Sequence, residues 1–387
     1  MNRLDSLLAT ALARIEAAGQ RRILRETALA ARGRLVRGAR ELVDFSSNDY
    51  LGLARHPLLA ERAQAWAARY GTGSGASRLV TGTSAEHAAL EARIAAFKGT
   101  EAALLFATGW QANAAAIPAL LAAMPGAAVF TDRLIHASMH AGLAMAGVRR
   151  HRFRHNDLAH LEHLLDTRGK EAPARLILTE SVFSMDGDRA DLIRLAGIAQ
   201  RHDAALFVDE AHATGVLGPE GRGLSATVPG QVDLVMGTFS KALGGFGAYV
   251  AGSQVLIDYL TNTASGFVFT TAPPPAVLGA IDAALDLVPG MEAERRHLAT
   301  LGEQLRTGLA ALGIDHGASS TQIVPAVIGA EGDAMALSRR LEAAGFLASA
   351  IRPPTVPPGT SRLRIALRAT HEASDIDALL AALEAAR

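Results

Sequence analysis

Short apolar runs alternate with helix-length segments between residues 102 and 252, and this alternation constrains the fold more than any other feature of the chain. Strands joined in this way by helices form a parallel sheet that is covered on both faces. The 247–252 run follows a glycine turn and is expected to lie antiparallel. The other expected strands are 102–107, 127–131, one between 139 and 169, 175–179, 204–208 and 232–236. We therefore predict an α/β fold with a mostly parallel sheet.

The pattern changes after residue 275, where a long helical region, 276–312, is interrupted near Pro289 and Gly290. Shorter elements follow and predict a smaller C-terminal α+β domain, with strands 323–327, 347–351 and 362–367 and helices 333–344 and 373–386. At the other end, residues 1 to 26 are expected to be helical. The expected division is an N-terminal helical segment 1–45, a large domain 46–288 and a small domain 289–387.

The composition excludes several classes of protein. Lys+Arg and Asp+Glu both number 38 in the 387 residues, so no overall charge recruits nucleic acid or an anionic membrane. The chain has no cysteine, which excludes disulfides, thiolate nucleophiles and Cys-ligated metals. No apolar run is long enough to cross a bilayer, and residues 1–26 lack the apolar core of a signal peptide. These features fit a cytoplasmic protein without a metal site.

Functional side chains gather where the predicted strands end. In open parallel sheets, ligands bind beyond the carboxyl ends of the strands. One polar residue at such an end would be ordinary, but six at equivalent ends indicate a site. They are Gly109, His136, Ser184, Asp209, His212 and Lys241.

Lys241 follows a mostly apolar strand and has small, flexible neighbours that leave room for a bulky group. A lone lysine is usually a surface cation. Here, however, Asp209 and His212 lie at the end of another predicted strand, which favours a site that includes the lysine. A lysine amine can form an imine with the aldehyde of pyridoxal phosphate (PLP), and a carboxylate keeps the pyridine nitrogen protonated. We therefore predict a PLP site in which Lys241 holds the cofactor and Asp209 contacts the pyridine nitrogen.

The remaining strand-end residues fit the phosphate of the same cofactor. A glycine between a strand and a helix aims backbone amides at an anion, so Gly109 and Trp110 are expected to bind the phosphate. Ser240 or the Thr270–Thr271 pair would add hydroxyl groups.

Four further side chains are expected at the cofactor ring. Ser184 and Thr238 would donate hydrogen bonds to the ring oxygen or the phosphate, and His212 would bond the ring hydroxyl. His136 would stack on the ring or polarise a substrate carbonyl. Taken alone, either histidine is more often a structural hydrogen-bonding residue.

Two groups of arginines are candidates for binding anions, and for the first of them the expected anion is the carboxylate of an amino-acid substrate, which the guanidinium fork matches. Arg364 and Arg362 share one face of a predicted strand, and the alternative is a pair of surface arginines. Near the N-terminus, Arg21, Arg22 and Arg25 form either a solvated helix face or an anion-binding site.

Several sequence blocks together resemble the α-oxoamine synthases, fold-type I PLP enzymes related to class II aminotransferases. The resemblance covers nearly the whole chain, in the segments 45–52, 73–75, 132–138, 184–188, 208–215 and 237–244. It implies an acyltransferase that condenses an amino acid with an acyl thioester and releases carbon dioxide, with Lys241 as the proton carrier. It also implies a homodimer in which Thr270 and Thr271 reach the neighbouring subunit's phosphate.

Within the family, Arg22 and the 351–360 segment are similar to the members that act in biotin biosynthesis. This implies L-alanine and a pimeloyl thioester of coenzyme A or acyl carrier protein as substrates. Arg22 would meet the distal end of the pimeloyl chain, while Asn48 and Thr355 would contact substrate. The alternatives are glycine-using relatives, such as glycine C-acetyltransferase or 5-aminolevulinate synthase, and a non-catalytic binding subunit, which the presence of Lys241 disfavours.

Overall fold

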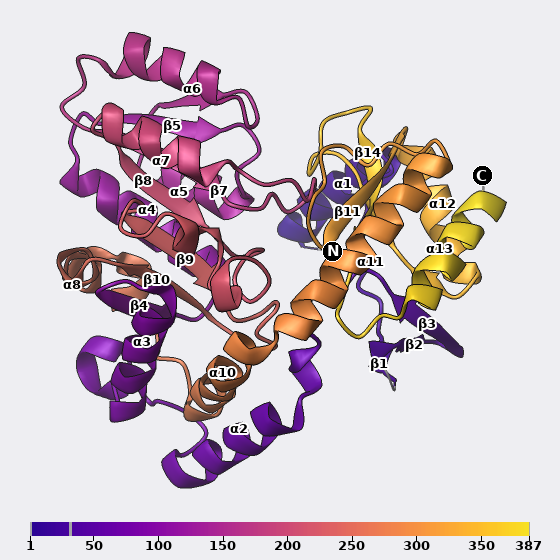
Figure 1. Ribbon diagram of the computed structural model, residues 1–387, viewed down its shortest axis with the longest axis horizontal. Coiled ribbons are helices and arrows are strands. Elements are labelled where there is room, and N and C mark those ends of the chain that lie inside the picture. Colours follow the sequence, from indigo (N-terminus) through magenta and orange to yellow (C-terminus); the bar gives the residue numbers. More distant parts are fainter. Residues whose placement is uncertain (1, 31–32, 387) are drawn as a thin grey trace.

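The computed structural model of the chain describes residues 2–30 and 33–386. Its centre is a seven-stranded sheet in the order β4-β10-β9-β8-β7-β5-β6 (Figure 1). The strands are β4 (Ala102–Phe106), β5 (Ala128–Asp132), β6 (Arg150–Phe153), β7 (Arg175–Glu180), β8 (Ala205–Asp209), β9 (Leu234–Thr238) and β10 (Ala248–Gly252). Within the sheet, the neighbouring strands β9, β8, β7, β5 and β6 pair in parallel. Strand β10 is antiparallel to both of its neighbours, β4 and β9. Both the parallel sheet and its antiparallel strand are confirmed.

Apolar residues on both faces bury this sheet between two helical layers. Successive side chains of a strand point to opposite faces. Val129 and Leu176 therefore pack with α4 (Gly109–Ala123) and α5 (Ala137–Met145). Phe130 and Ile177 pack on the other face with α6 (Leu158–Leu164) and α7 (Leu192–Arg201). This packing of helices on both faces fixes the ends of the strands and therefore the positions of the loop residues that follow them.

Helices α2 (Pro57–Tyr70), α3 (Ala85–Lys98), α8 (Gln254–Thr263) and α9 (Ser265–Val268) complete the part of the molecule around this sheet. Short helical turns lie at η2 (Leu53–Arg55), η3 (Arg78–Gly82), η4 (Leu165–Gly169), η5 (Pro219–Gly221) and η6 (Leu224–Thr227). No helix in the described ranges is long and apolar enough to cross a membrane.

A helical connection leads from the seven-stranded sheet to the C-terminal part (Figure 1). It consists of α10 (Pro275–Leu287), the short turn η7 (Val288–Gly290) and α11 (Glu292–Ala311). The predicted interruption near Pro289 is confirmed. Arg295 stabilises the interruption, because its guanidinium donates to the carbonyls of Val288 at 2.7 Å and Pro289 at 3.1 Å.

The C-terminal part contains an antiparallel sheet in the order β11-β14-β13. Its elements are β11 (Ile323–Gly329), α12 (Glu331–Ala343), β13 (Ser349–Ile351), β14 (Ser361–Ala366) and α13 (Ala373–Ala385). The expected single strand 347–351 is wrong. It is divided between β13 and β12 (Phe346–Leu347), which joins a second small sheet with β1 (Ala28–Leu29), β2 (Leu35–Arg37) and β3 (Arg40–Asp44). The three-part division of the chain stays a prediction.

The N-terminal helix is shorter than expected. Helix α1 (Arg3–Ala17) ends before Gly19. The φ of Gly19 is +66°, the left-handed backbone conformation that commonly terminates an α-helix. The prediction of helix to residue 26 is therefore wrong, and Arg22 lies in a segment without regular structure. No residue of α1 is buried, and its apolar side chains, among them Leu4 and Leu7, are exposed.

Candidate active site

Lys241 lies in a short return between β9 and β10. The return is closed by hydrogen bonds from the Phe239 amide to the Gly247 carbonyl at 2.9 Å and from the Gly245 amide to the Phe239 carbonyl at 2.8 Å. Gly244 has a φ of +64°, and a Cβ there would lie 2.4 Å from the backbone of Leu53. Only glycine fits this position, so the small residues around Lys241 serve the packing of its own loop.

The Lys241 amine is held in the interior of the site. Its Nζ lies 2.8 Å from Nε2 of His212. Burial lowers the pKa of Lys241 to about 8, and the carboxyl groups of Asp209 and Glu180 partly oppose that effect. A lysine with a pKa of about 8 is partly neutral near that pH, and its neutral amine can act as a nucleophile and as a base.

Asp209 and Glu180 end two neighbouring strands in register, so their carboxyl groups lie in adjacent positions. Asp209 accepts hydrogen bonds from the Asn113 side-chain amide and from the Ala211 backbone amide, both at 2.9 Å. Burial and the nearby Asp209 raise the pKa of Glu180 well above its usual range. Glu180 therefore takes up a proton more readily than an ordinary glutamate, because the Asp209 carboxyl lies beside it.

His212 connects the lysine to a tyrosine that sequence reasoning missed. Its Nδ1 lies 2.7 Å from the hydroxyl of Tyr50. Burial, followed by the positive charge of Lys241, lowers the pKa of His212 well below its usual range. A neutral imidazole can accept from Lys241 on Nε2 and donate to Tyr50 on Nδ1. The Tyr50 hydroxyl in turn donates to the side-chain oxygen of Asn48 at 3.1 Å.

The C-terminal sheet brings Arg364 to the same place. Its Nε donates to the Ser184 carbonyl at 2.5 Å, and its Nη1 donates to Asn48 at 3.1 Å. Its neighbour on the same face, Arg362, instead forms an ion pair with Asp186. The structure thus distinguishes the two candidates, since Arg362 has a carboxylate partner whereas the hydrogen bonds of Arg364 go to neutral groups.

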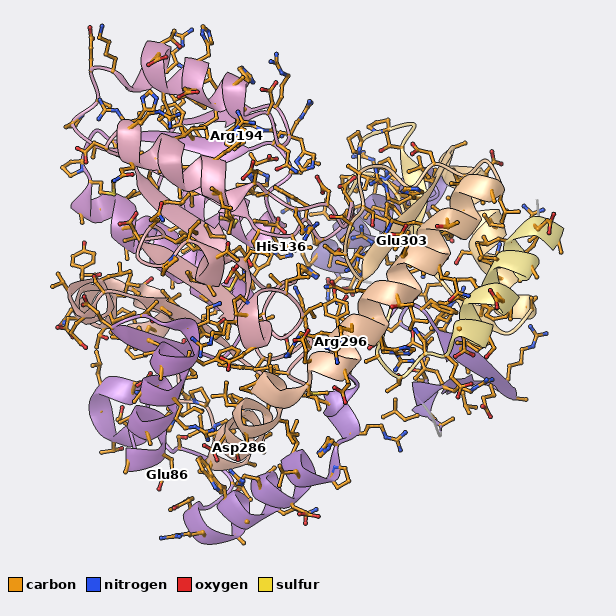
Figure 2. The ribbon with its side chains drawn as sticks, viewed as in Figure 1. Glu86, His136, Arg194, Asp286, Arg296 and Glu303 are labelled. Carbon is orange, nitrogen blue, oxygen red and sulfur yellow. The ribbon has the colours of Figure 1, made fainter. Side chains whose placement is uncertain are left out.

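His136 caps the start of α5 and lies where the two parts of the molecule meet (Figure 2). Its Nδ1 lies 2.7 Å from the Ser138 hydroxyl. Desolvation lowers the pKa of His136, so the ring is neutral at neutral pH. The Trp110 ring stands edge-on to it, with centroids 6.4 Å apart, and Gly109 begins α4 beside it.

The hydroxyl candidates differ in position. The Thr238 and Ser240 side-chain oxygens lie 2.8 Å apart next to Lys241. Thr270 and Thr271 follow α9, and Thr271 pairs with Ser77 in an isolated bridge. No contact with Lys241 or Asp209 is seen for either threonine among the described residues.

The two expected acyl-chain segments are neighbours. Arg352 donates hydrogen bonds to the carbonyls of Gly19 and Arg21. The 352–359 loop, which contains Thr355, therefore lies against the segment of Arg22, and both of these side chains are exposed. This proximity could not be predicted from the spacing in the sequence.

The residues present fit PLP. They supply an amine of lowered pKa, a strand-end carboxylate, a neutral imidazole and the free amides at the start of α4. Buried polar atoms without a protein partner lie in the same region: Asn113 Oδ1, Thr131 Oγ1 and Glu180 Oε1. Among the described residues, no group of three or more His, Asp or Glu side chains could hold a metal ion.

Comparison with known proteins agrees with this arrangement. Residues 40–383 match the family of class I and II aminotransferases. The chain belongs to this family. The 8-amino-7-oxononanoate synthase of Gluconacetobacter diazotrophicus is 59% identical, over 99% of this chain and 98% of that protein. The enzyme of the same name from Geobacter sulfurreducens is 50% identical, over 97% and 96%.

Solved structures of the family share the fold. A structure of serine palmitoyltransferase with PLP as an internal aldimine has a TM-score of 0.91 and 29% identity, over 100% of this chain and 98% of that one. The 8-amino-7-oxononanoate synthase of Francisella tularensis has a TM-score of 0.76 and 26% identity, over 89% and 97%. The predicted fold-type I architecture is confirmed.

Proposed function

We propose that this chain catalyses the PLP-dependent, decarboxylative condensation of L-alanine with a pimeloyl thioester in biotin biosynthesis. The products are 8-amino-7-oxononanoate, carbon dioxide and the free thiol carrier. The observation that carries the chemistry is the Lys241 amine, of pKa about 8, held against His212 near the carboxylate of Asp209. The choice of substrates is supported by the name of the relatives that are 50–59% identical along almost their whole length.

The chain's own residues would hold the cofactor as follows. Lys241 would bind its aldehyde carbon, Asp209 its pyridine nitrogen and His212 its ring hydroxyl. The amides of Gly109 and Trp110 would bind the phosphate. Hydroxyl contacts would come from Ser184, Thr238 and Ser240 and, across a homodimer interface, from Thr270 and Thr271. When bound, PLP withdraws electrons from the α-carbon of the amino acid.

Lys241 is the proton carrier in this proposal. With alanine bound, the lysine amine would be free to remove the α-proton and later to return one. Its lowered pKa suits both directions, because proton transfer is most efficient when the pKa lies near the working pH. Neutral His136 would donate a hydrogen bond to the thioester oxygen as negative charge develops there.

Arg364 is the proposed partner of the alanine carboxylate, with Asn48 beside it. It lies near His212 through Tyr50, and its hydrogen bonds to neutral groups leave its charge available. Arg22 and Thr355 would meet the far end of the pimeloyl chain. We further propose that the enzyme is a cytoplasmic homodimer and that the carrier is coenzyme A or acyl carrier protein.

Thiol release across a matrix of substrates tests this proposal. The PLP-loaded protein is given alanine, glycine or serine with acetyl, pimeloyl or palmitoyl thioesters. We expect alanine with a pimeloyl thioester to give the highest kcat/KM. Faster turnover of glycine with acetyl-CoA would assign the chain to a glycine-using relative instead.

A further inference from the structure

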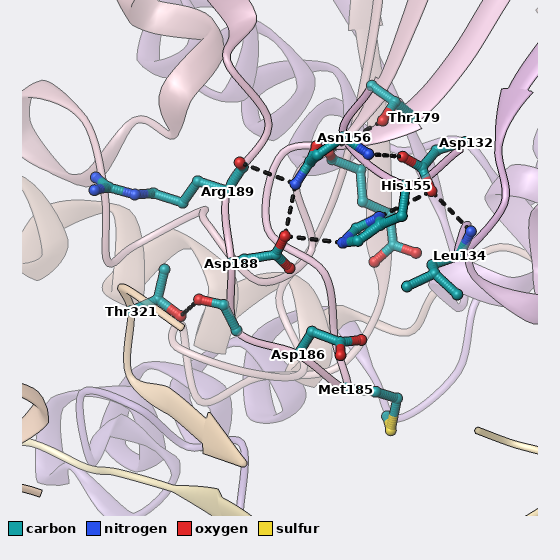
Figure 3. Close-up of polar contacts among 12 residues, drawn as sticks. Asp132, Leu134, His155, Asn156, Thr179, Met185, Asp186, Asp188, Arg189 and Thr321 are labelled. Atoms are coloured by element: carbon teal, nitrogen blue, oxygen red, sulfur yellow. Dashed lines mark hydrogen bonds and ion pairs between the residues drawn. The ribbon is translucent and has the colours of Figure 1, made fainter. Parts of the chain in front are cut away.

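A charged cluster lies outside the lysine site, between two loops that extend from the cluster to that site (Figure 3). The first is the 132–138 loop, which begins at the end of β5 and carries His136. The second is the 183–188 loop, which follows β7. The cluster consists of His155 and Asn156, just beyond β6, with Asp132 and Asp188.

His155 bridges the two loops. Its Nδ1 lies 3.0 Å from Asp132 Oδ1, and its Nε2 lies 2.8 Å from Asp188 Oδ2. A carboxylate on each side requires a donor on each ring nitrogen, which only the imidazolium form supplies. Burial works against that charge, but hydrogen bonds and attraction from Asp132 and Asp188 outweigh it and raise the pKa of His155 to about 10.

Asn156 repeats the bridge with uncharged groups. Its backbone amide donates to Asp132 Oδ2 at 2.8 Å, and its side-chain amide donates to Asp188 Oδ2 at 2.6 Å. It does so with a φ of +52°, a conformation that asparagine tolerates better than most residues. A strained backbone is kept only where its surroundings hold it, so the bridge is a built feature.

The 183–188 loop connects this bridge to the C-terminal part. Its Ser184 carbonyl accepts from Arg364, and its Asp186 pairs with Arg362. Its Gly187 carbonyl accepts from the Thr321 hydroxyl at 2.8 Å. A shift of this loop would therefore move the guanidinium proposed to bind alanine.

The other end of the bridge, Asp132, supports the loop that carries His136. Asp132 Oδ1 also accepts from the Leu134 amide at 2.8 Å, which fixes the turn two residues before His136. One imidazolium thus lies between the loop of His136 and the loop that holds Arg364. Without its charge, two buried carboxylates would face each other across a neutral ring.

We propose that His155 is a positioning residue: as an imidazolium between Asp132 and Asp188, it sets the loop of His136 against the loop that holds Arg364. It does not touch the reacting atoms. Its kinetic consequence rests on the proposed function, while its charge state does not. The segments proposed to bind the acyl chain, around Arg22, lie outside the bridge, and His136 would bond the thioester oxygen mainly as charge develops there. Binding of the acyl donor should therefore depend on the bridge less than binding of alanine does.

Kinetics of His155→Gln test the role. We expect kcat to fall and the KM for alanine to rise, together costing about 10- to 100-fold in kcat/KM, because small misplacements of binding groups have effects of this size. The KM for the acyl donor should change less than about twofold, within the range of surface substitutions. A smaller folded fraction alone would lower kcat and leave both KM values unchanged, and that result would overturn the proposal.

Two further variants keep the test decisive if His155→Gln folds poorly. His155→Arg retains a cation that can donate to both carboxylates and should recover part of the loss, whereas equal losses in both variants would contradict a role for the charge. Asp188→Asn should cost less in the His155→Gln background than in the wild type, because it breaks the same bridge. Additive losses would argue against a bridge that acts as one unit.

His202→Gln is a matched control. His202 also lies between two carboxylates, 3.9 Å from both Glu162 and Asp166, but at the C-terminal end of α7. That end precedes β8 and is remote from the carboxyl ends of the strands. We expect its kinetic constants to match the wild type.

The charge itself can be observed by NMR on protein with ¹⁵N-labelled histidine, with His155 assigned by the loss of its signals in His155→Gln. Both ring nitrogens should stay protonated from pH 6 to about 9. Titration near the ordinary histidine value, about 6.5, would refute the imidazolium bridge. If the wild type prefers another amino acid and thioester, the kinetic comparison uses that pair, so failure of the proposed function and failure of the bridge remain distinguishable.

Discussion

The lysine site at the sheet and the N-terminal arginine cluster (Arg21, Arg22 and Arg25) hold their side chains in opposite ways. Asp209 and His212 are buried at strand ends, and each has hydrogen-bonded partners. Arg21 and Arg25 are more than half exposed and form surface ion pairs, with Glu16 and Glu342. Surface ion pairs of this kind add little to the folding stability, about 0–1 kcal/mol each, and so fix their side chains weakly. The proposed catalytic side chains are therefore fixed by the core of the chain, whereas the proposed acyl-chain contacts lie on its surface.

Lys241→Ala should have the largest effect. Loss of its proton transfers alone should cost about 10²–10⁴-fold in kcat, and loss of the covalent attachment adds to this. Thiol release and the absorbance of the PLP-loaded protein measure both. The chain has three lysines, Lys98, Lys170 and Lys241, so borohydride reduction followed by peptide mapping identifies the attachment site. Label on exposed Lys170 at the stoichiometry of the protein would refute the assignment.

Asp209→Asn should follow, with about a 100-fold loss of kcat, as for a group that sets a catalytic protonation state. The asparagine keeps the shape and the contact with Asn113 but removes the negative charge. Steady-state thiol release at saturating PLP measures the effect, with exposed Asp258→Asn as the control. Full activity of Asp209→Asn would show that the strand-end carboxylate is not needed for the electron-withdrawing chemistry.

Arg364→Lys should raise the KM for alanine about 10- to 100-fold, because lysine cannot grip a carboxylate with two parallel hydrogen bonds. Arg362→Lys is the matched comparison on the same strand face. Its guanidinium pairs with Asp186, so a smaller change in the KM for alanine is expected. The reverse order would move the carboxylate contact to Arg362.

Arg22→Ala should have a smaller and more selective effect, about a tenfold rise in the KM for the pimeloyl donor. One charged contact at an exposed site is worth roughly this much when a ligand partly covers it. The KM for alanine should not change. Arg21→Ala and Arg25→Ala are the controls, and a larger effect in either one would assign the tail contact to it.

The smallest effect concerns stability. The pKa of His155 is raised on folding, so its contribution is complete below the unfolded value, about 6.5, and is lost as the pH rises through about 10. The Tm of His155→Gln should therefore lie a few degrees, about 2–4 °C, below the wild type at pH 6 and approach it near pH 10. A Tm difference that grows with pH would have the wrong sign.

The sequence was sufficient to predict which residues lie at the end of an apolar strand or within three positions after it. Lys241, Asp209 and His212 are in this class, because the carboxyl ends of parallel strands share one edge of the sheet. Glu180 ends a strand in the same way but was missed, because its raised pKa depends on the register of β7 with β8. Asn113 was missed because it lies inside a mostly apolar helix, and only the packing of α4 brings it to Asp209.

Predictions failed where distant parts of the chain decide the local structure. The 346–351 segment divides because Leu347 pairs with Asp44 while Ser349 pairs with Arg364. Helix α1 ends early at Gly19, although the arginines that follow are good helix formers. The contact of Arg352 with the Gly19–Arg21 segment has no local signal, since it joins residues more than 330 positions apart.

The return that carries Lys241 also limits where the chain can change its length. Both of its ends are interior strands, since β10 lies between β4 and β9. An insertion between residues 239 and 247 would disturb the hydrogen bonds between Phe239, Gly245 and Gly247 and the close contact of Gly244 with Leu53, whereas surface loops accept added residues at little cost. The exposed part of the 352–359 loop has no such restriction. Variants with altered acyl-donor preference are therefore best sought by changing the length of that loop while the lysine return is left intact.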